Sequence, residues 1–387
     1  MPPSMSRIEL ALLAFAALAV LAVVWQLLLL WLASRLVPER GPDEVYKVAC
    51  DDGWVIELAR YKSNGRAPHL PPVICCHGIG ANSISLDLAE EISLPRYLRS
   101  RGFDAWLLDL RGRGGSARPP EGRGAYAYDF SDHARYDVKA AIDLVRKETG
   151  AKKVAWVGHS MGGMSIYAHC ELHGDEALQA AVVCGSPVAW VRPPRIAIFA
   201  RFARLHRLPA LYYVLAARIV SPLAGYWHPR IAKLIVNPRN MDGRLMRVGL
   251  ARALANISTR AIQQFARWIT SNELRSADHV FFENLGRITI PWLAIGGHVD
   301  RLVPPENVKV GLDRIGSRDK KWILAGKEHG CVEDYGHIDL LLGSRARDEI
   351  YKPIAEFLEA HPVDAPAPGP PAQAASTSSP SSVSAAA

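Results

Sequence analysis

Apolar residues are distributed along this chain in three patterns. The first is a run from Ile8 to Leu32 that is apolar almost throughout, with Glu9 at its edge and Gln26 as its one internal polar residue. The second is a series of short apolar runs, which are typical of strands buried on both faces of a parallel sheet. The third is recurrence at helical spacing between those runs, as from Val138 to Val145. The alternation predicts an α/β fold, with a mostly parallel sheet covered by helices on both faces.

The expected strands and helices follow in chain order. A hairpin over 45–61 turns at Asp51-Asp52-Gly53, a combination that favours a tight turn. We expect the buried strands at 73–76, 103–108, 154–157, 180–184, 288–295 and 321–324. We expect helices at 89–101, from a cap at Ser131 or Asp132 to a stop at Gly150, after Ser160, and at 350–361.

The segment 188–287 interrupts this alternation. Its prolines divide it into several predicted helices, and we interpret it as a helical cap inserted over the C-terminal edge of the sheet. Between Ile196 and Arg207, large apolar residues alternate with arginines, as in a basic amphipathic helix. Such a face is either solvated or rests on an anionic membrane surface.

The N-terminal run predicts a membrane anchor. As a helix it would be about 35 Å long, enough to cross a bilayer. Two tryptophans and then Arg35 and Arg40 near its end resemble residues that hold a helix at the membrane interface. A cleaved signal peptide and a buried core helix are the alternatives, but the run is long for a signal and no small-x-small cleavage site follows closely. We therefore predict a single-pass anchor through residues 8–34, with flanking charges that favour neither orientation.

Composition completes the domain division. From position 362 onward the chain consists mainly of proline, alanine and serine without periodicity, which predicts a disordered tail over 362–387. The expected organisation is thus an anchor over 1–40, one α/β domain over 41–361 with its cap at about 188–287, and the tail.

The formal net charge of +8 belongs to the cap. Residues 188–290 contain 16 Lys+Arg against 4 Asp+Glu, whereas the rest of the chain is slightly acidic. A basic excess confined to one segment argues against nucleic-acid binding and makes the cap a second candidate contact with the membrane. The six cysteines have no zinc-ligand spacing, and Cys75, Cys76 and Cys184 lie in apolar runs where cysteine is usually buried.

The strongest chemical signal lies at 154–163, VAWVGHSMGG. A strand-like run leads into Gly-x-Ser-x-Gly, and a helix can follow at once. That context predicts a nucleophile elbow, a sharp strand-to-helix turn that presents the hydroxyl of Ser160. The glycines are required because side chains beside so tight a turn would collide with backbone.

Three further loops suit the same chemistry. The strand at 73–76 runs into His77-Gly78-Ile79-Gly80, whose backbone can face a serine nucleophile. Asp300 comes just after the strand at 288–295, and His337 lies in a loop after the last strand. The Gly-rich loop from Asp109 to Ser116 lacks a phosphate-binding pattern, and we interpret it as a structural turn.

The order Ser160, Asp300, His337 is the order used by the α/β-hydrolase fold. With this order and the motifs VICCHGIGANS, LDLRGRGGS, VGHSMGG, GGHVDRLVPPENV and YGHIDLLLG, the chain from about 45 to 361 resembles the α/β-hydrolase superfamily, and within it the lipase and esterase branch with acid-lipase-like enzymes.

The resemblance implies a role for each site residue. Ser160 would be the nucleophile, His337 the base and Asp300 its orienting acid, while the backbone N–H groups of Ile79 and Met161 would form the oxyanion hole. It implies no metal and no cofactor. His329 is an alternative base and Asp339 an alternative acid, and both fit the family pattern less well. His77 and His159 are expected to be structural.

The sequence therefore predicts a membrane-anchored serine hydrolase that cleaves a lipophilic carboxylic ester. An acyltransferase is an alternative, because it would share the first half-reaction and differ only in the acceptor. A non-catalytic binding protein on the same fold is a second alternative, since a fold alone does not establish activity.

Overall fold

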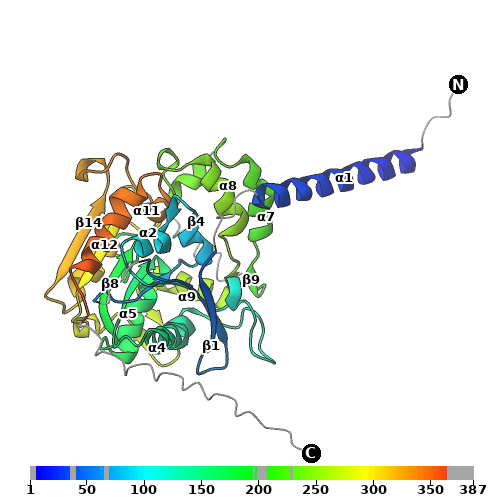
Figure 1. The fold of residues 1–387 in the computed structure, drawn as a ribbon. Helices are drawn as coiled ribbons and strands as arrows, with labels where there is room; N and C mark the ends of the chain where they lie inside the picture. The colour runs from blue at the N-terminus through cyan, green and yellow to red at the C-terminus, as the bar shows by residue number, and fades with distance from the viewer. Residues whose placement is uncertain are drawn as a thin grey trace, which may run out of the picture.

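The computed structural model describes residues 6–34, 41–64, 69–194, 197, 207–226 and 230–363. A central sheet with helices on both sides forms the body of the molecule, and one long helix, α1 (Arg7–Ser34), projects from it (Figure 1). The predicted basic stretch at 196–207 lies almost wholly outside the described residues, and so does the predicted tail from 364 onward.

The main sheet has eight strands in the order β1-β2-β6-β3-β7-β8-β13-β14. The strands from β6 to β14 pair in parallel, while β2 runs antiparallel to both of its neighbours. The predicted hairpin and all the predicted buried strands are present: β1 (Glu44–Ala49), β2 (Val55–Tyr61), β3 (Val73–Cys76), β6 (Ala105–Asp109), β7 (Val154–His159), β8 (Leu178–Cys184), β13 (Trp292–Gly297) and β14 (Lys320–Ala325).

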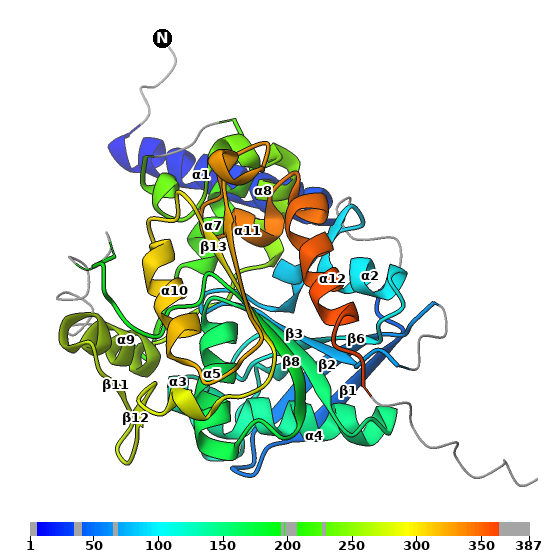
Figure 2. The same ribbon diagram turned by 90° about the vertical axis from the view of Figure 1, so that its left-hand side faces the viewer.

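The core consists of two layers, one on each face of the sheet. Successive residues of a strand point to opposite faces, so Val154 and Trp156 join one layer and Ala155 and Val157 the other. One layer is covered by α4 (Val138–Thr149), α5 (Met161–His173) and α10 (Pro305–Arg314), and the other by α2 (Leu94–Ser100) and α12 (Lys352–Glu359) (Figure 2). The central strands are apolar throughout because both of their faces are buried.

Several predicted boundaries are wrong. The helix expected at 89–101 is only α2, because β4 (Asp87–Ala89) and β5 (Ile92–Ser93) occupy the start of that range. The cap expected at Ser131 or Asp132 is Asp129, whose side chain accepts from the Ser131 N–H at the start of α3 (Phe130–Asp132). The strand expected at 288–295 begins after Pro291, which cannot donate a ladder hydrogen bond.

The described part of the cap is only partly helical. Its helices are α7 (Val214–Val220), α8 (Gly243–Arg252) and α9 (Thr259–Ser271), with short 3₁₀ turns η4 (Ser221–Leu223), η5 (Arg230–Leu234), η6 (Pro238–Asn240) and η7 (Leu285–Arg287) between them. Two-residue strands, which the sequence analysis does not predict, pair as β9 (Ala210–Leu211) with β10 (Ile257–Ser258) and β11 (Leu274–Arg275) with β12 (Val280–Phe281).

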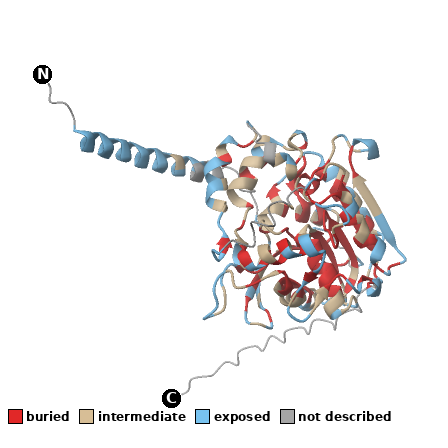
Figure 3. Ribbon diagram, turned by 180° about the vertical axis from the view of Figure 1, so that it is seen from behind, coloured by how far each residue is buried: buried red, intermediate tan, exposed pale blue. Residues whose placement is uncertain are grey.

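Helix α1 stands apart from both core layers. From Arg7 to Leu28 it is long and apolar enough to cross a membrane, and none of these residues is buried in the protein (Figure 3). Its C-terminal part contacts α7 and α8, where the indole Nε1–H of Trp25 donates to the Ile219 carbonyl over 2.9 Å. Two further elements lie toward the C-terminal end of the fold. Helix α11 (Asp339–Leu342) follows the His337 loop, and η9 (Arg347–Tyr351) leads into α12.

All six cysteines are free thiols and five are buried, including the three expected in the core. They act as small apolar side chains within the two layers.

Candidate active site

Ser160 occupies the turn between β7 and α5. Its backbone has φ 53° and ψ −119°, a conformation that costs a non-glycine residue about 1–3 kcal/mol. The turn is held by the Ser160 N–H, which donates to the Cys184 carbonyl, and by the Ser160 carbonyl, which accepts from Gly163 and Met164. The surrounding packing requires glycine, because a Cβ on Gly162 would lie 2.4 Å from the Cys76 carbonyl oxygen. The predicted elbow geometry is thus present.

His337 and Asp300 form a buried pair beside this turn. The Nδ1 of His337 lies 2.7 Å from Oδ2 of Asp300, so Nδ1 carries the proton and Nε2 keeps a free lone pair. The other carboxylate oxygen of Asp300 accepts from the backbone N–H groups of Leu302 and Val303. The carboxylate therefore has a single orientation, and the imidazole is held in the tautomer that a general base needs.

His159 contacts the same pair through the backbone. Its Nε2–H donates to the His337 carbonyl over 3.0 Å, and the two rings lie 4.9 Å apart between centroids. Burial lowers the pKa of His159 to about 3, with the neighbouring His337 as a second cause. A neutral imidazole is therefore packed against His337 and supports its position, which agrees with the structural role predicted for His159.

Asp339, the alternative acid, accepts hydrogen bonds from the cap and from the loop just before His337. Its Oδ1 accepts from the Asn237 N–H, and its Oδ2 accepts from the Gly336 N–H and the Asn240 amide. Burial raises the pKa of this carboxyl, and the three N–H donors oppose that shift. Asp339 thus ties η6 of the cap to the loop that carries His337.

The loop from His77 to Gly80 is fixed by three successive carbonyls. The Gly78 oxygen accepts from His77 Nδ1, and the Gly80 oxygen accepts from the hydroxyl of Tyr213 over 2.6 Å. The Ile79 oxygen accepts from Nη2 and Nε of Arg113, at 2.7 and 3.2 Å. Within the described residues, the N–H groups of Ile79 and Met161 have no hydrogen-bond acceptor of their own, as an oxyanion hole requires.

A chain of buried polar side chains holds Arg113, and through it the loop from His77 to Gly80, in place. Arg113 also contacts Nε2 of His133, whose Nδ1 lies 2.8 Å from Asp137. Burial lowers the pKa of His133 to about 4, so a neutral ring accepts from the guanidinium. The expected structural role of Asp109 and Arg111 takes a specific form: Asp109 accepts from the backbone of Ser83 and Gly115, and Arg111 pairs with Asp52 and Asp137 rather than with Asp109.

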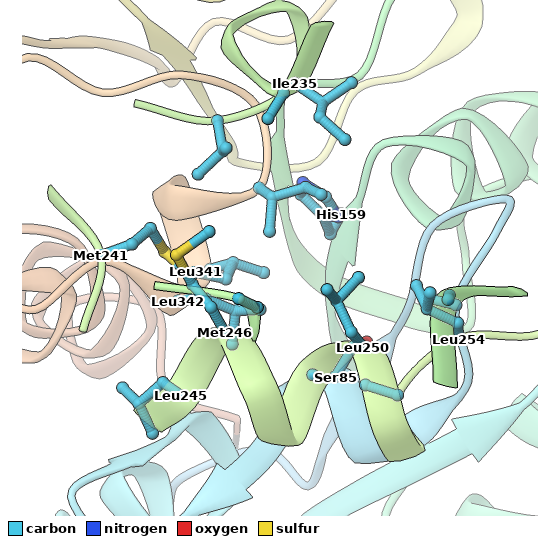
Figure 4. A pocket seen from close by; sticks show the side chains of 18 of the residues that line it. Ser85, His159, Ile235, Met241, Leu245, Met246, Leu250, Leu254, Leu341 and Leu342 are labelled. Carbon is cyan, nitrogen blue, oxygen red and sulfur yellow. The ribbon is translucent and has the colours of Figure 1, made fainter. Parts of the chain in front are cut away.

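A large apolar cavity lies between this site and the cap. Its volume is about 780 Å³, in the range of lipid-sized and drug-sized ligand pockets. Ala81, His159 and Ile338 line its inner end, and each neighbours a loop of the site in sequence. The rest of the wall comes mainly from the cap and from α11 (Figure 4): Ala217, Val220, Leu223, Ile235, Met241, Leu245, Met246, Leu250, Leu254, Leu341 and Leu342.

A family model described as the alpha/beta hydrolase fold matches residues 71–344, most of the chain. The chain belongs to the α/β-hydrolase family. Gastric triacylglycerol lipase of Homo sapiens is 33% identical to it over 139 residues, which cover 33% of this chain and 35% of that protein. Lipase member K of Homo sapiens is 23% identical over 84% of this chain and 90% of that protein.

The fold is also found in solved structures. A bacterial membrane phospholipase A has a TM-score of 0.51 and 19% identity to this α/β hydrolase, covering 91% of this chain and 97% of that one. At such low identity the likeness shows the fold alone. The curated relatives make this hydrolase lipase-like.

The alternative base, His329, lies elsewhere in the hydrolase. Its ring is 5.4 Å from that of His298, and with Glu328 the two histidines place possible ligand atoms within 4.8 Å of one another. Glu328 and His329 are both exposed, whereas His337 is buried. This group is the one set of described residues that offers three such atoms to a metal ion, and the chain is predicted to need none.

Sequence reasoning missed two residues that hold the site together, Arg113 and Tyr213. Arg113 lies in the LRGRGG motif, and nothing in that motif predicts that its side chain is buried. Two arginines in a glycine-rich loop are nevertheless a signal that guanidinium groups hydrogen-bond to backbone carbonyls there. Tyr213 comes from the cap, more than a hundred positions away from Gly80, and no local pattern marks its hydroxyl.

Proposed function

We propose that this α/β hydrolase is a membrane-anchored serine ester hydrolase, in which Ser160, His337 and Asp300 form a catalytic triad. The observation that carries the proposal is the 2.7 Å contact between His337 and Asp300 beside the strained turn at Ser160. A serine hydroxyl needs a base in a defined tautomer, and a buried carboxylate on Nδ1 provides that tautomer.

The reaction would proceed in two halves. Nε2 of His337 takes the Ser160 proton as Oγ attacks the ester carbonyl, and the N–H groups of Ile79 and Met161 stabilise the oxyanion. His337 then gives the proton to the leaving alcohol, and the acyl group stays on Oγ. Water, deprotonated by Nε2, attacks the acyl-enzyme, and the carboxylic acid leaves as Ser160 recovers its proton.

The cavity supports a lipophilic ester as the substrate. Nearly all of its lining side chains are aliphatic or methionine, so an acyl chain inside it would leave water without losing a polar contact. The relatives named lipase favour the same class of substrate.

A fluorophosphonate probe tests the nucleophile directly. We expect the full chain in detergent to be labelled on Ser160 and to release carboxylic acid from a medium-chain p-nitrophenyl ester. Ser160→Ala should lose both the label and the turnover. Equal labelling of Ser160→Ala would contradict the proposal, and turnover that depends on an added alcohol acceptor without release of acid would favour the acyltransferase.

The anchor is supported by the exposed apolar surface of α1. An uncleaved anchor predicts that protein extracted from membranes keeps its N-terminus and resists removal by alkaline carbonate. A mature N-terminus beyond residue 34, found by mass spectrometry, would instead identify a cleaved signal sequence.

A further inference from the structure

Helix α7 of the cap has an unusual surface. Its seven residues, VLAARIV, are apolar except for Arg218, and none of them is buried. A helix that is apolar on all sides is normally found inside a protein core or inside a membrane, because in water each exposed side chain loses hydrophobic stabilisation. The described elements that contact α7 leave every one of its residues at least partly exposed, so the helix needs a further apolar surrounding.

The two sides of α7 face different spaces. Ala217 and Val220, three positions apart, line the large cavity. Leu215 and Ile219, four positions apart on another side of the helix, do not line it, and Leu215 is 64% exposed. The helix is thus a thin wall between the cavity and the outside, apolar on both surfaces.

The outer apolar surface continues beyond α7. Leu211 and Tyr212 before the helix and Tyr226 after it are all exposed. Exposed large apolar residues that gather within and beside one helix favour an interaction site over an ordinary solvent-facing surface. We call the surface formed by Leu211, Tyr212, Leu215, Ile219 and Tyr226 the α7 face.

Helix α1 fixes the depth of this face. Trp25 donates to the Ile219 carbonyl, and beyond Trp25 the run is apolar to Leu32 apart from Gln26, about 10 Å further along the helix at 1.5 Å per residue. The run from Ile8 to Leu32 is about 35 Å long, so a bilayer core about 30 Å thick that it spans contains Trp25 near one of its ends. Because the Ile219 carbonyl is hydrogen-bonded to Trp25, the α7 face lies at the depth of Trp25, near the boundary of the hydrocarbon.

The charges around the face match an anionic membrane. The cap elements near α7 carry Arg218, Lys233 and Arg247 with Asp242 as the one acid in those elements, while Arg244 is paired with Glu91. Arginine and lysine at the headgroup level are attracted to anionic lipids, while the apolar side chains between them enter the acyl region.

We propose that the α7 face docks in the bilayer beside α1 and that the substrate is a membrane lipid that enters the cavity from the bilayer. This inference rests on the proposed ester hydrolase function. Val220 and Leu223 line the cavity and are both about half exposed, and they adjoin Ile219, where α1 is attached. The cavity therefore opens next to α1, at the level where acyl chains begin.

The occupant of the face can be identified by quenching. In the full chain with Cys331→Ser, which removes the one cysteine that is not buried, an NBD label is attached at Leu215→Cys or, as the control, at Lys147→Cys on α4. In vesicles of phosphatidylcholine and phosphatidylglycerol, we expect doxyl-labelled lipids to quench the label at 215 at least threefold more than at 147. Equal quenching at both sites would overturn the proposal.

A second copy of the chain is the competing occupant. A label at 215 that is shielded from aqueous iodide and yet not quenched by doxyl lipids would place another protein surface on the face and overturn the proposal.

Activity provides the second test. Leu215→Glu places a charge on the α7 face, and Val55→Glu makes the same kind of change at an exposed strand position outside the cap. With a fluorogenic diacyl lipid in the vesicles, we expect Leu215→Glu to lose at least tenfold in turnover and Val55→Glu to lose less than twofold. With a soluble short-chain ester, both variants should match the wild type.

The outcomes separate the two proposals. Wild type that hydrolyses both esters, with Leu215→Glu equal to Val55→Glu on the vesicle lipid, would overturn the docking inference and leave the hydrolase function standing. Wild type that hydrolyses neither ester would overturn both. Equal losses of Leu215→Glu on the soluble and the vesicle ester would indicate a general folding defect and contradict docking.

Discussion

Single backbone N–H groups decide how the site residues are oriented. Asp300 points one oxygen at the N–H groups of Leu302 and Val303 and the other at His337. Because an acceptor is required at the first position, any replacement side chain must keep its oxygen there. The second terminal atom of the side chain then faces His337 Nδ1, and whether that atom accepts or donates a hydrogen bond decides the tautomer of the imidazole.

Asp300→Asn follows from this geometry. The amide oxygen would face Leu302 and Val303, so the NH₂ group would face His337 Nδ1 and force the proton onto Nε2. Nε2 could then no longer accept the Ser160 proton, and we expect kcat to fall by about 10³- to 10⁴-fold. Steady-state kinetics on a soluble ester checks this, with thermal unfolding as a control for folding. A loss below tenfold would show that Asp300 does not orient the base.

Arg113 is the second residue whose role is set by a carbonyl. Its two hydrogen bonds hold the Ile79 oxygen and so orient the loop whose N–H group is proposed to stabilise the oxyanion. We expect Arg113→Met to lower kcat by about 10- to 100-fold with KM nearly unchanged, since a misplaced donor affects the transition state more than substrate binding.

A matched variant separates this positioning role from stability. Arg113→Lys keeps a charged donor for the Ile79 carbonyl, and we expect it to recover part of kcat. If the Lys and Met variants lose kcat equally while both unfold at the wild-type temperature, Arg113 does not position the loop.

The elements of the cap are joined to the two loops that carry the site. Tyr213, just before α7, donates to the Gly80 carbonyl, and η6 is held to the His337 loop through Asp339. The cap is therefore attached to the His77–Gly80 loop and to the His337 loop. A change in either attachment should be felt at the site as well as in the cap.

Asp339→Asn tests one attachment. Each oxygen of Asp339 accepts an N–H, so an amide NH₂ in either position would face a donor and leave it without an acceptor. We expect a loss of about 1–3 kcal/mol in unfolding free energy and a lower kcat, because Gly336 precedes His337. Asp348→Asn, the same exchange at an exposed position, should change neither quantity. Equal unfolding midpoints in urea for the two variants would contradict the assigned role.

The whole molecule contains several histidines that are buried without charge. Burial lowers the pKa of His77, His159 and His169 to about 3, from an ordinary value of 6.5. Their unfolded forms bind protons below pH 6.5 whereas the folded forms do not, so unfolding is favoured as the pH falls from 6.5 toward 3. Carboxylates whose pKa is lowered in the folded protein, such as Asp137, reduce its stability only when the pH falls below their ordinary pKa of 3.8.

His169→Leu isolates one of these groups, since His169 lies on α5 beyond the elbow. Between pH 7 and pH 5 each such histidine should cost about 2 kcal/mol of stability. We expect the wild type to lose stability over this interval and His169→Leu to lose about 2 kcal/mol less, measured by urea unfolding at both pH values. Parallel losses in the two proteins would show that His169 is protonated in the folded state.

Local patterns in the sequence determined the fold class and the identity of the candidate site residues. The apolar runs of the central strands and the glycines around Ser160 are each set within a few neighbouring residues, and the order Ser160, Asp300, His337 can be read directly along the chain. Strand burial and turn geometry depend on such short stretches, so these features could be predicted. Boundaries failed at β4 and β5, two very short strands that pair with each other and replace the first part of an expected helix.

Only the tertiary structure decided how these parts act together. The acceptors for Arg113 and Tyr213, the attachment of Asp339 and the contact of Trp25 with Ile219 all join residues far apart in the chain. The sequence marks 8–32 as an apolar run and 188–287 as a cap, but a side chain becomes a cavity wall or an outer face only when a neighbouring element is placed against it. For α7, the described neighbours leave an exposed apolar outer side and an inner side that lines the cavity, and that fact depends on packing alone.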